Sequence, residues 1–67
     1  MDFDTIRIEE LNLSARAFNS LKRDNIHYIG QLLNYSMDDL KKIKNFGQKS
    51  IDEVIYALKQ QYGLLIE

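Results

Sequence analysis

The chain has no cysteine and no proline, and its single histidine is His27. Without cysteine it has neither a disulfide framework nor a thiolate metal site, and one histidine cannot hold zinc alone. No apolar run approaches the length of a membrane span, and the acidic start MDFDTIRIEE is unlike a secretory signal. We therefore expect a cytoplasmic protein that needs no metal or other cofactor and does not contact membranes.

The residue combinations that carry catalysis are also missing. The stretch GQKS lacks the second glycine that a phosphate-binding P-loop places five residues earlier, and no strand precedes it. The serines have only His27 as a possible base. The paired carboxylates, Asp38 with Asp39 and Asp52 with Glu53, lie in expected first helical turns, where they are ordinary partners of the helix dipole. The sequence does not predict an enzyme.

What is present is a short chain with an uneven distribution of charge. Its 67 residues, 45% of them hydrophobic, are enough for one small folded domain, residues 1–67, whose residues 1–5 read as a linker remnant or a disordered start. The net charge is −1. Residues 12–51, however, carry seven basic against three acidic side chains, a net +4, and acidic ends flank them. A basic middle favours an anionic partner.

The hydrophobic pattern predicts an all-α, compact four-helix domain that follows an irregular N-terminal segment. The first helix begins after Ser14 as N-cap, with Ala15, Phe18 and Leu21 facing inward. Its outward stripe has the helical spacing i, i+3, i+4 and i+7 and consists of Arg16, Asn19, Ser20 and Arg23.

Three further helices follow along the sequence. Ile26, Ile29, Leu32 and Leu33 supply a short second helix, and Ser36 with Asp39 forms a capping box for a third that buries Leu40 and Ile43. The longest begins near Gln48, keeps the helical period at Ile51, Val54, Ile55, Leu58 and Tyr62, and ends at Gly63 in a left-handed cap.

Two features of this pattern suit phosphates. Gly47 opens a helix whose free N–H groups and positive dipole end can receive a phosphate, with Lys49 and Ser50 beside it. The basic stripe around Arg16 supplies a second contact. Each feature also has an ordinary explanation, because the stripe is typical of a solvated helix face and Ser50 with Glu53 fits a capping box. Together they predict a two-point clamp on a nucleic-acid backbone.

Two stretches carry a specific resemblance. The runs IEELNLSARAFNSLKRDNIHYIGQLL and LKKIKNFGQKSIDEVIYAL resemble the C-terminal domain of the bacterial RNA polymerase α subunit, from about Ile6 to Leu65. The most specific parts are Leu13, Arg16, Asn19, Leu21 and Lys22 in the first helix, and the run from Asn45 to Glu53 before and within the last.

The resemblance implies a helix-hairpin-helix-like DNA surface on this fold. In the family the arginine that matches Arg16 enters the minor groove of A/T-rich promoter DNA, where a narrow groove concentrates negative potential. The expected DNA-binding residues are therefore Arg16, Asn19, Ser20, Gly47, Lys49, Ser50 and Glu53. Ser20 stands where the family often has cysteine, and Gln48 where a second lysine is usual, which predicts a weaker attraction for phosphates.

The resemblance also implies protein partners. The expected σ-factor contacts are Glu9, Glu10 and Asn12, the last standing where many members carry glutamate, and the expected activator contacts are Ser36, Met37, Asp38 and Asp39. A complete α subunit joins this domain to the rest of the polymerase through a flexible linker. We expect a monomeric domain excised from such a subunit. The alternatives are a free-standing small interaction protein and a non-specific helix-hairpin-helix DNA binder.

Overall fold

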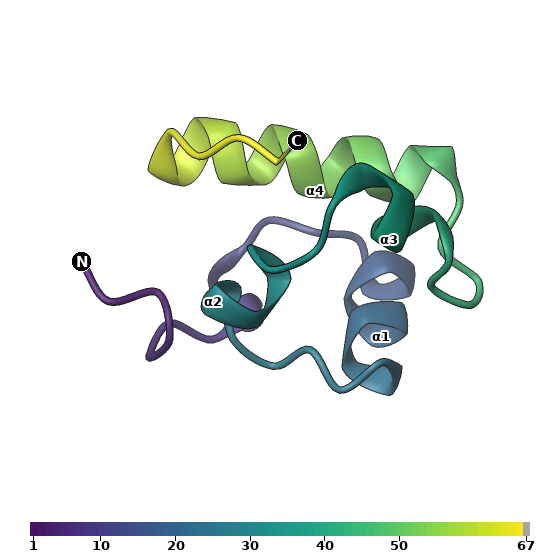
Figure 1. The fold of residues 1–67 in the computed structure, drawn as a ribbon, viewed down its shortest axis with the longest axis horizontal. Coiled ribbons are helices and arrows are strands. Elements are labelled where there is room, and N and C mark those ends of the chain that lie inside the picture. Colours follow the sequence, from purple (N-terminus) through teal and green to yellow (C-terminus); the bar gives the residue numbers. More distant parts are fainter. Residues whose placement is uncertain (67) are drawn as a thin grey trace.

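The computed structural model describes residues 1–66, which form five helical segments and no strand. A short 3-10 helix, η1 (Ile8–Glu10), precedes α1 (Ala15–Arg23), α2 (Ile29–Leu32), α3 (Met37–Lys41) and α4 (Gln48–Tyr62). The predicted all-α, four-helix architecture is confirmed. In Figure 1, α4 runs along one side of the molecule and α1 lies below its N-terminal end. In this view α3 is seen between α4 and α1, and α2 lies between α1 and the N-terminal segment.

The longest helix, α4, forms as the apolar spacing predicts. Ile51, Val54 and Leu58 are at most 1% exposed, and they lie on one face at helical spacing. Gly63 ends the helix with φ of 67°, a left-handed conformation that glycine adopts without strain. Its N–H donates to the Lys59 carbonyl at 2.9 Å. The predicted start and end of this helix are both confirmed.

The inward face of α1 differs from the prediction at two positions. The buried residues are Ala17, Ser20 and Leu21, whereas Ala15 is exposed. Because successive residues of an α-helix are about 100° apart, Ala15 and Ala17 point in nearly opposite directions. The prediction that Ala15 faces inward and Ser20 outward is therefore wrong.

The two shorter helices are too short to be stable alone, and packing holds them in place. Ser36 and Asp39 form the predicted capping box at the start of α3. Leu32 of α2 and Leu40 of α3 are fully buried. The core contains residues from every segment: Ile8, Leu11, Ala17, Leu21, Ile26, Ile29, Leu32, Leu40, Ile43, Phe46, Ile51, Val54, Ala57 and Leu58.

The first residues of the protein pack on the domain. The Gly30 N–H donates to the Phe3 carbonyl at 2.8 Å, and the Phe3 ring lies edge-on to that of Tyr62, with centroids 5.7 Å apart. A Cβ at position 30 would lie 3.2 Å from the Asp4 Cα atom, so glycine permits this close approach. In the structure residues 2–5 thus form a turn against α2 and α4, although the sequence suggests a linker remnant or disordered start.

Candidate nucleic-acid interface

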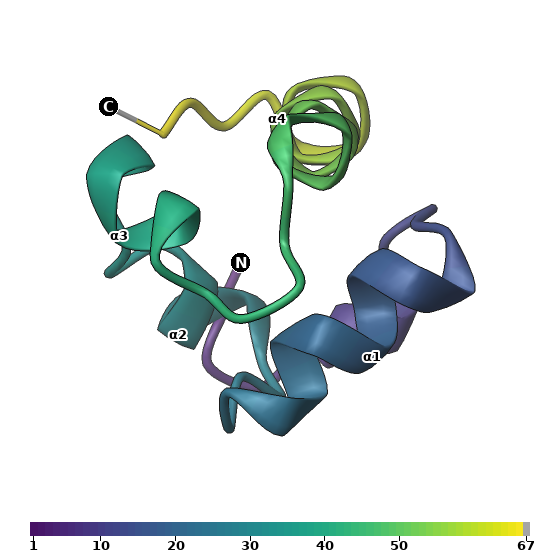
Figure 2. The same ribbon diagram turned by 90° about the vertical axis from the view of Figure 1, so that its right-hand side faces the viewer.

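The N-termini of α1 and α4 border the same surface hollow. In Figure 2, α4 is seen nearly end-on and the segment between α3 and α4 descends towards α1 before α4 begins. The hollow has a volume of about 380 Å³, and its lining comes from both helix starts: Ser14, Arg16, Gly47, Gln48, Lys49, Ser50 and Glu53. The structure therefore brings together two helix starts that are far apart in the sequence.

The start of α4 leaves backbone donors open towards this hollow. Gly47 is the N-cap, in an extended conformation with φ of −88°, and it has no side chain with which to cap the helix. A Cβ added there would have no other atom within 4 Å. Lys49 is exposed, whereas Ser50 is only 7% exposed. The free first-turn N–H groups and the dipole make this end of α4 attractive to an anion.

Glu53 bonds to Ser14 and not to Ser50. Its carboxylate accepts hydrogen bonds from the Ser14 N–H at 2.8 Å and from the Ser14 hydroxyl at 3.1 Å. Ser14 in turn caps α1, because its Oγ accepts from the Ala17 N–H at 3.3 Å. The capping-box alternative for Ser50 and Glu53 is wrong, since α4 begins at Gln48 and Ser50 already lies within its first turn. Glu53 instead fixes the N-terminus of α1 beside that of α4.

The two polar residues between Arg16 and Arg23 on the predicted stripe lie in different surroundings. Asn19 is exposed, in keeping with its predicted outward position. Ser20 is 4% exposed, and its hydroxyl donates to the Asn45 carbonyl at 3.3 Å. Asn45 has a φ of 61°, in the left-handed region that asparagine tolerates. Ser20 thus ties α1 to the turn before α4, and the direct DNA contact implied for it stays a prediction.

The expected σ-factor contacts lie on a segment that α4 also holds. The Asn12 N–H donates to Gln61 Oε1 at 2.8 Å, and Gln61 Nε2 donates to the Glu10 carbonyl at 2.7 Å. The Glu9 carboxylate pairs with the Lys22 ammonium, whose hydrogen bond lowers the pKa of Glu9. Glu10 and Asn12 are exposed. Gln61 was missed by sequence reasoning, because a glutamine near a helix end carries no pattern of its own.

The expected activator contacts surround the capping box of α3. The Ser36 N–H donates to Asp39 Oδ2 at 3.0 Å, which lowers the pKa of the Asp39 carboxyl. The Asp39 N–H donates to Ser36 Oγ at 3.1 Å. Met37 is half-buried and Asp38 is exposed. Of the two aspartates, Asp39 already has a structural role and Asp38 does not.

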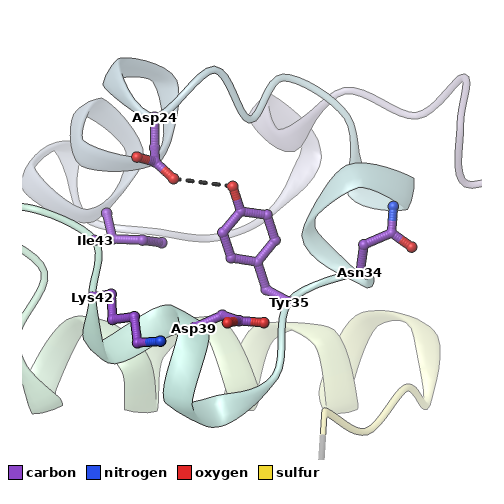
Figure 3. A pocket seen from close by; sticks show the side chains of 6 residues that line it. All are labelled: Asp24, Asn34, Tyr35, Asp39, Lys42 and Ile43. Atoms are coloured by element: carbon purple, nitrogen blue, oxygen red, sulfur yellow. Dashed lines mark hydrogen bonds between the residues drawn. The ribbon is translucent and has the colours of Figure 1, made fainter.

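A second hollow, shown in Figure 3, lies between the end of α1 and α3. The Tyr35 hydroxyl donates to Asp24 Oδ2 at 3.0 Å. Partial burial, together with this bond, raises the pKa of the Tyr35 hydroxyl. The local sequence pattern does not indicate this bond, because the partner of the Tyr35 hydroxyl is eleven residues away.

Within residues 1–66 no group of three or more histidine, cysteine or acidic side chains is arranged to hold a metal ion. None of the described helices combines the length and the apolar character that crossing a membrane requires.

Comparison with known proteins identifies the family. The model of the C-terminal domain of the bacterial RNA polymerase α chain matches residues 1–60. The protein belongs to this family. A relative, the α subunit of DNA-directed RNA polymerase from Pyropia yezoensis, is 59% identical over 59 residues, which are 88% of this sequence and 19% of that protein. The corresponding subunit of Huperzia lucidula is 48% identical over 65 residues, 97% of this sequence and 19% of that protein.

A solved structure of the family has the same fold. The NMR structure of the C-terminal domain of the RNA polymerase α subunit from Helicobacter pylori matches with a TM-score of 0.76 at 44% identity, and the match covers 85% of this sequence and 50% of that one. The present sequence spans about a fifth of the length of the α-subunit relatives, 19% in both cases given above.

Proposed function

We propose that this protein is a DNA-docking module of an RNA polymerase that binds A/T-rich promoter DNA. Arg16 would enter the minor groove, and the N-terminus of α4 would bind the adjacent phosphate backbone. The observation that carries the proposal is the shared hollow, in which Arg16, Gly47 and Lys49 lie at one surface. The turn before α4 and the start of α4 would then form the helix-hairpin-helix-like part of the interface.

The chemistry of the hollow supports different roles for its two sides. A guanidinium gives up water more readily than an ammonium, so Arg16 suits a narrow groove with concentrated negative potential. Open backbone N–H groups and Lys49 suit phosphate oxygens, which carry no sequence information. Groove width would therefore be read from α1, and the position on the backbone would be set by α4.

The protein partners of this module would bind elsewhere on the surface. Glu10 and Asn12 would offer an exposed polar contact to a σ factor, and Asp38 would offer one to an activator. In the assembled enzyme a linker would join this domain to the rest of an α subunit. Tethering raises the effective concentration, which a contact made through a few phosphates needs.

Amide correlation spectra recorded during titration with an A/T-tract duplex test this proposal. We expect the largest shifts at Arg16, at Asn19 and across Gly47–Ser50, with little change at Asp38. From roughly three to five neutralised phosphates we expect a log–log salt slope of about −3 to −5. An absence of any DNA-induced shift would favour a module that binds only proteins. Equal affinity for all duplexes would favour the non-specific binder.

A further inference from the structure

The polar stripe of α1 is divided into two parts by the turn before α4. The turn crosses the stripe at Ser20, whose hydroxyl binds the Asn45 carbonyl. Arg16 lies on one side of this crossing and Arg23 on the other, seven residues along the same helix. At about 1.5 Å per residue the two positions are about 10 Å apart along the helix axis. The basic stripe therefore continues beyond the hollow that contains Arg16.

A further hollow occupies the far side of this crossing. It has a volume of about 430 Å³ and is lined by Ser20, Arg23, Asp24, Ile43, Lys44 and Asn45. Arg23 comes from α1 and Lys44 from the turn before α4, so two separate segments each supply an exposed cation. Neither side chain forms an ion pair or hydrogen bond with another described residue. Lys22, next to Arg23, is by contrast paired with Glu9.

Two ordinary explanations for these cations have little support in the structure. An arginine in the last turn of a helix can bind terminal carbonyls, but at the end of α1 the backbone N–H groups of Asp24, Asn25 and Ile26 already do so. Asp24 also borders the hollow and is the nearest acidic neighbour of Arg23 in the sequence. Its carboxylate, however, accepts a hydrogen bond from the Tyr35 hydroxyl, on the side of the neighbouring hollow shown in Figure 3. Among the described residues, the two cations therefore lack an internal partner.

We propose that the hollow between Arg23 and Lys44 binds one further backbone phosphate of the same DNA duplex. This inference rests on the proposed function, because the site continues the surface that begins at Arg16. The separation of about 10 Å along α1 corresponds to about three base-pair steps of roughly 3.4 Å. Arg23 from α1 and Lys44 from the turn before α4 bind the phosphate together. They carry no base readout, so they add affinity and salt dependence but leave the A/T preference unchanged.

Salt-dependent titration of charge-matched variants tests this site. The test variant combines Arg23→Gln with Lys44→Gln. The control combines Lys41→Gln with Lys59→Gln, which removes the same charge from two exposed residues that border neither hollow. With a log–log salt slope of about −4 for the parent, raising the salt concentration from about 50 to 200 mM weakens parental DNA binding about 250-fold. Loss of one phosphate contact reduces this factor to about 70-fold in the test variant, whereas the control stays close to the parent.

The outcomes separate this inference from the proposed function. A test variant with a shallower slope and an unchanged A/T preference supports the site. If the test and control variants lose slope equally, the effect is one of overall charge and the site is refuted. If the parent binds DNA through Arg16 but the test variant keeps the parental slope, only this inference fails. A parent that binds no DNA overturns both.

Discussion

Replacing Glu53 with alanine should destabilise the domain much more than an ordinary surface substitution. The half-buried carboxylate accepts two hydrogen bonds from Ser14, at 2.8 and 3.1 Å. Ser14 is also the N-cap of α1, so without these two hydrogen bonds Ser14 is held less firmly and the start of α1 is weakened as well. A hydrogen bond to a charged group contributes about 1.5–3 kcal/mol, of which partial exposure to water removes a part. We expect a loss of about 1–2 kcal/mol, which lowers the melting temperature by roughly 4–16 °C in a domain of this size.

Thermal and urea unfolding, followed by circular dichroism, measure this effect. Asp52→Ala is the matched control, because the neighbouring Asp52 is exposed and accepts only a surface hydrogen bond from Gln48. The control should lie within about 0.5 kcal/mol of the parent. Equal destabilisation by the two substitutions would refute the claim that Glu53 joins α4 to α1.

Two further predictions concern the capping positions of α4 and α3. Gly47→Ala should leave the free energy of unfolding nearly unchanged, since φ is −88° and the added methyl meets no atom within 4 Å. The same methyl should weaken DNA binding, because it would stand before the open N–H groups of α4. Urea unfolding and a duplex titration check this, and an unchanged DNA affinity would remove Gly47 from the interface. Asp39→Asn should destabilise the domain at about pH 6 and less at about pH 3. The bond from the Ser36 N–H lowers the pKa of Asp39 from its usual 3.8, so the stabilisation it gives is present above that value and is lost as the pH falls through the folded-state pKa. Urea midpoints at the two pH values measure this, and a difference from the parent that did not change with pH would contradict it.

Local sequence patterns predicted the helices well where a side chain caps or packs within its own segment. The Ser36–Asp39 capping box, the glycine cap at Gly63 and the buried face of α4 all depend on spacings of a few residues. The pattern failed at Ser20, which the turn before α4 covers, and at Ala15, which lies on the exposed side of α1. Only the packing of helices that are distant in the sequence decides which polar residue is covered.

The sequence predicted which residues make up the candidate site better than it predicted the hydrogen bonds that join them. The sequence indicated Arg16, Gly47 and Lys49, and the structure brings them to one hollow. It did not reveal that Glu53 bonds to Ser14 across 39 positions, because a glutamate in a first helical turn has several common explanations. Nor did it indicate Gln61, whose two hydrogen bonds reach back to residues 10 and 12. Such long-range side-chain bonds have no local signature.

The central claim, that Arg16 reads groove width while α4 binds phosphates, is tested most directly by a comparison of two duplexes. Arg16 is exposed, so Arg16→Ala should change stability by no more than about half a kcal/mol. Parent, Arg16→Ala, Arg16→Lys and Lys49→Ala are each titrated with an A/T-tract duplex and a G/C-rich duplex of equal length at one salt concentration. We expect Arg16→Ala to lose much more affinity for the A/T tract, Arg16→Lys to recover part of that preference, and Lys49→Ala to weaken both duplexes alike. Equal losses on the two duplexes for Arg16→Ala would contradict the account and reduce Arg16 to another phosphate contact.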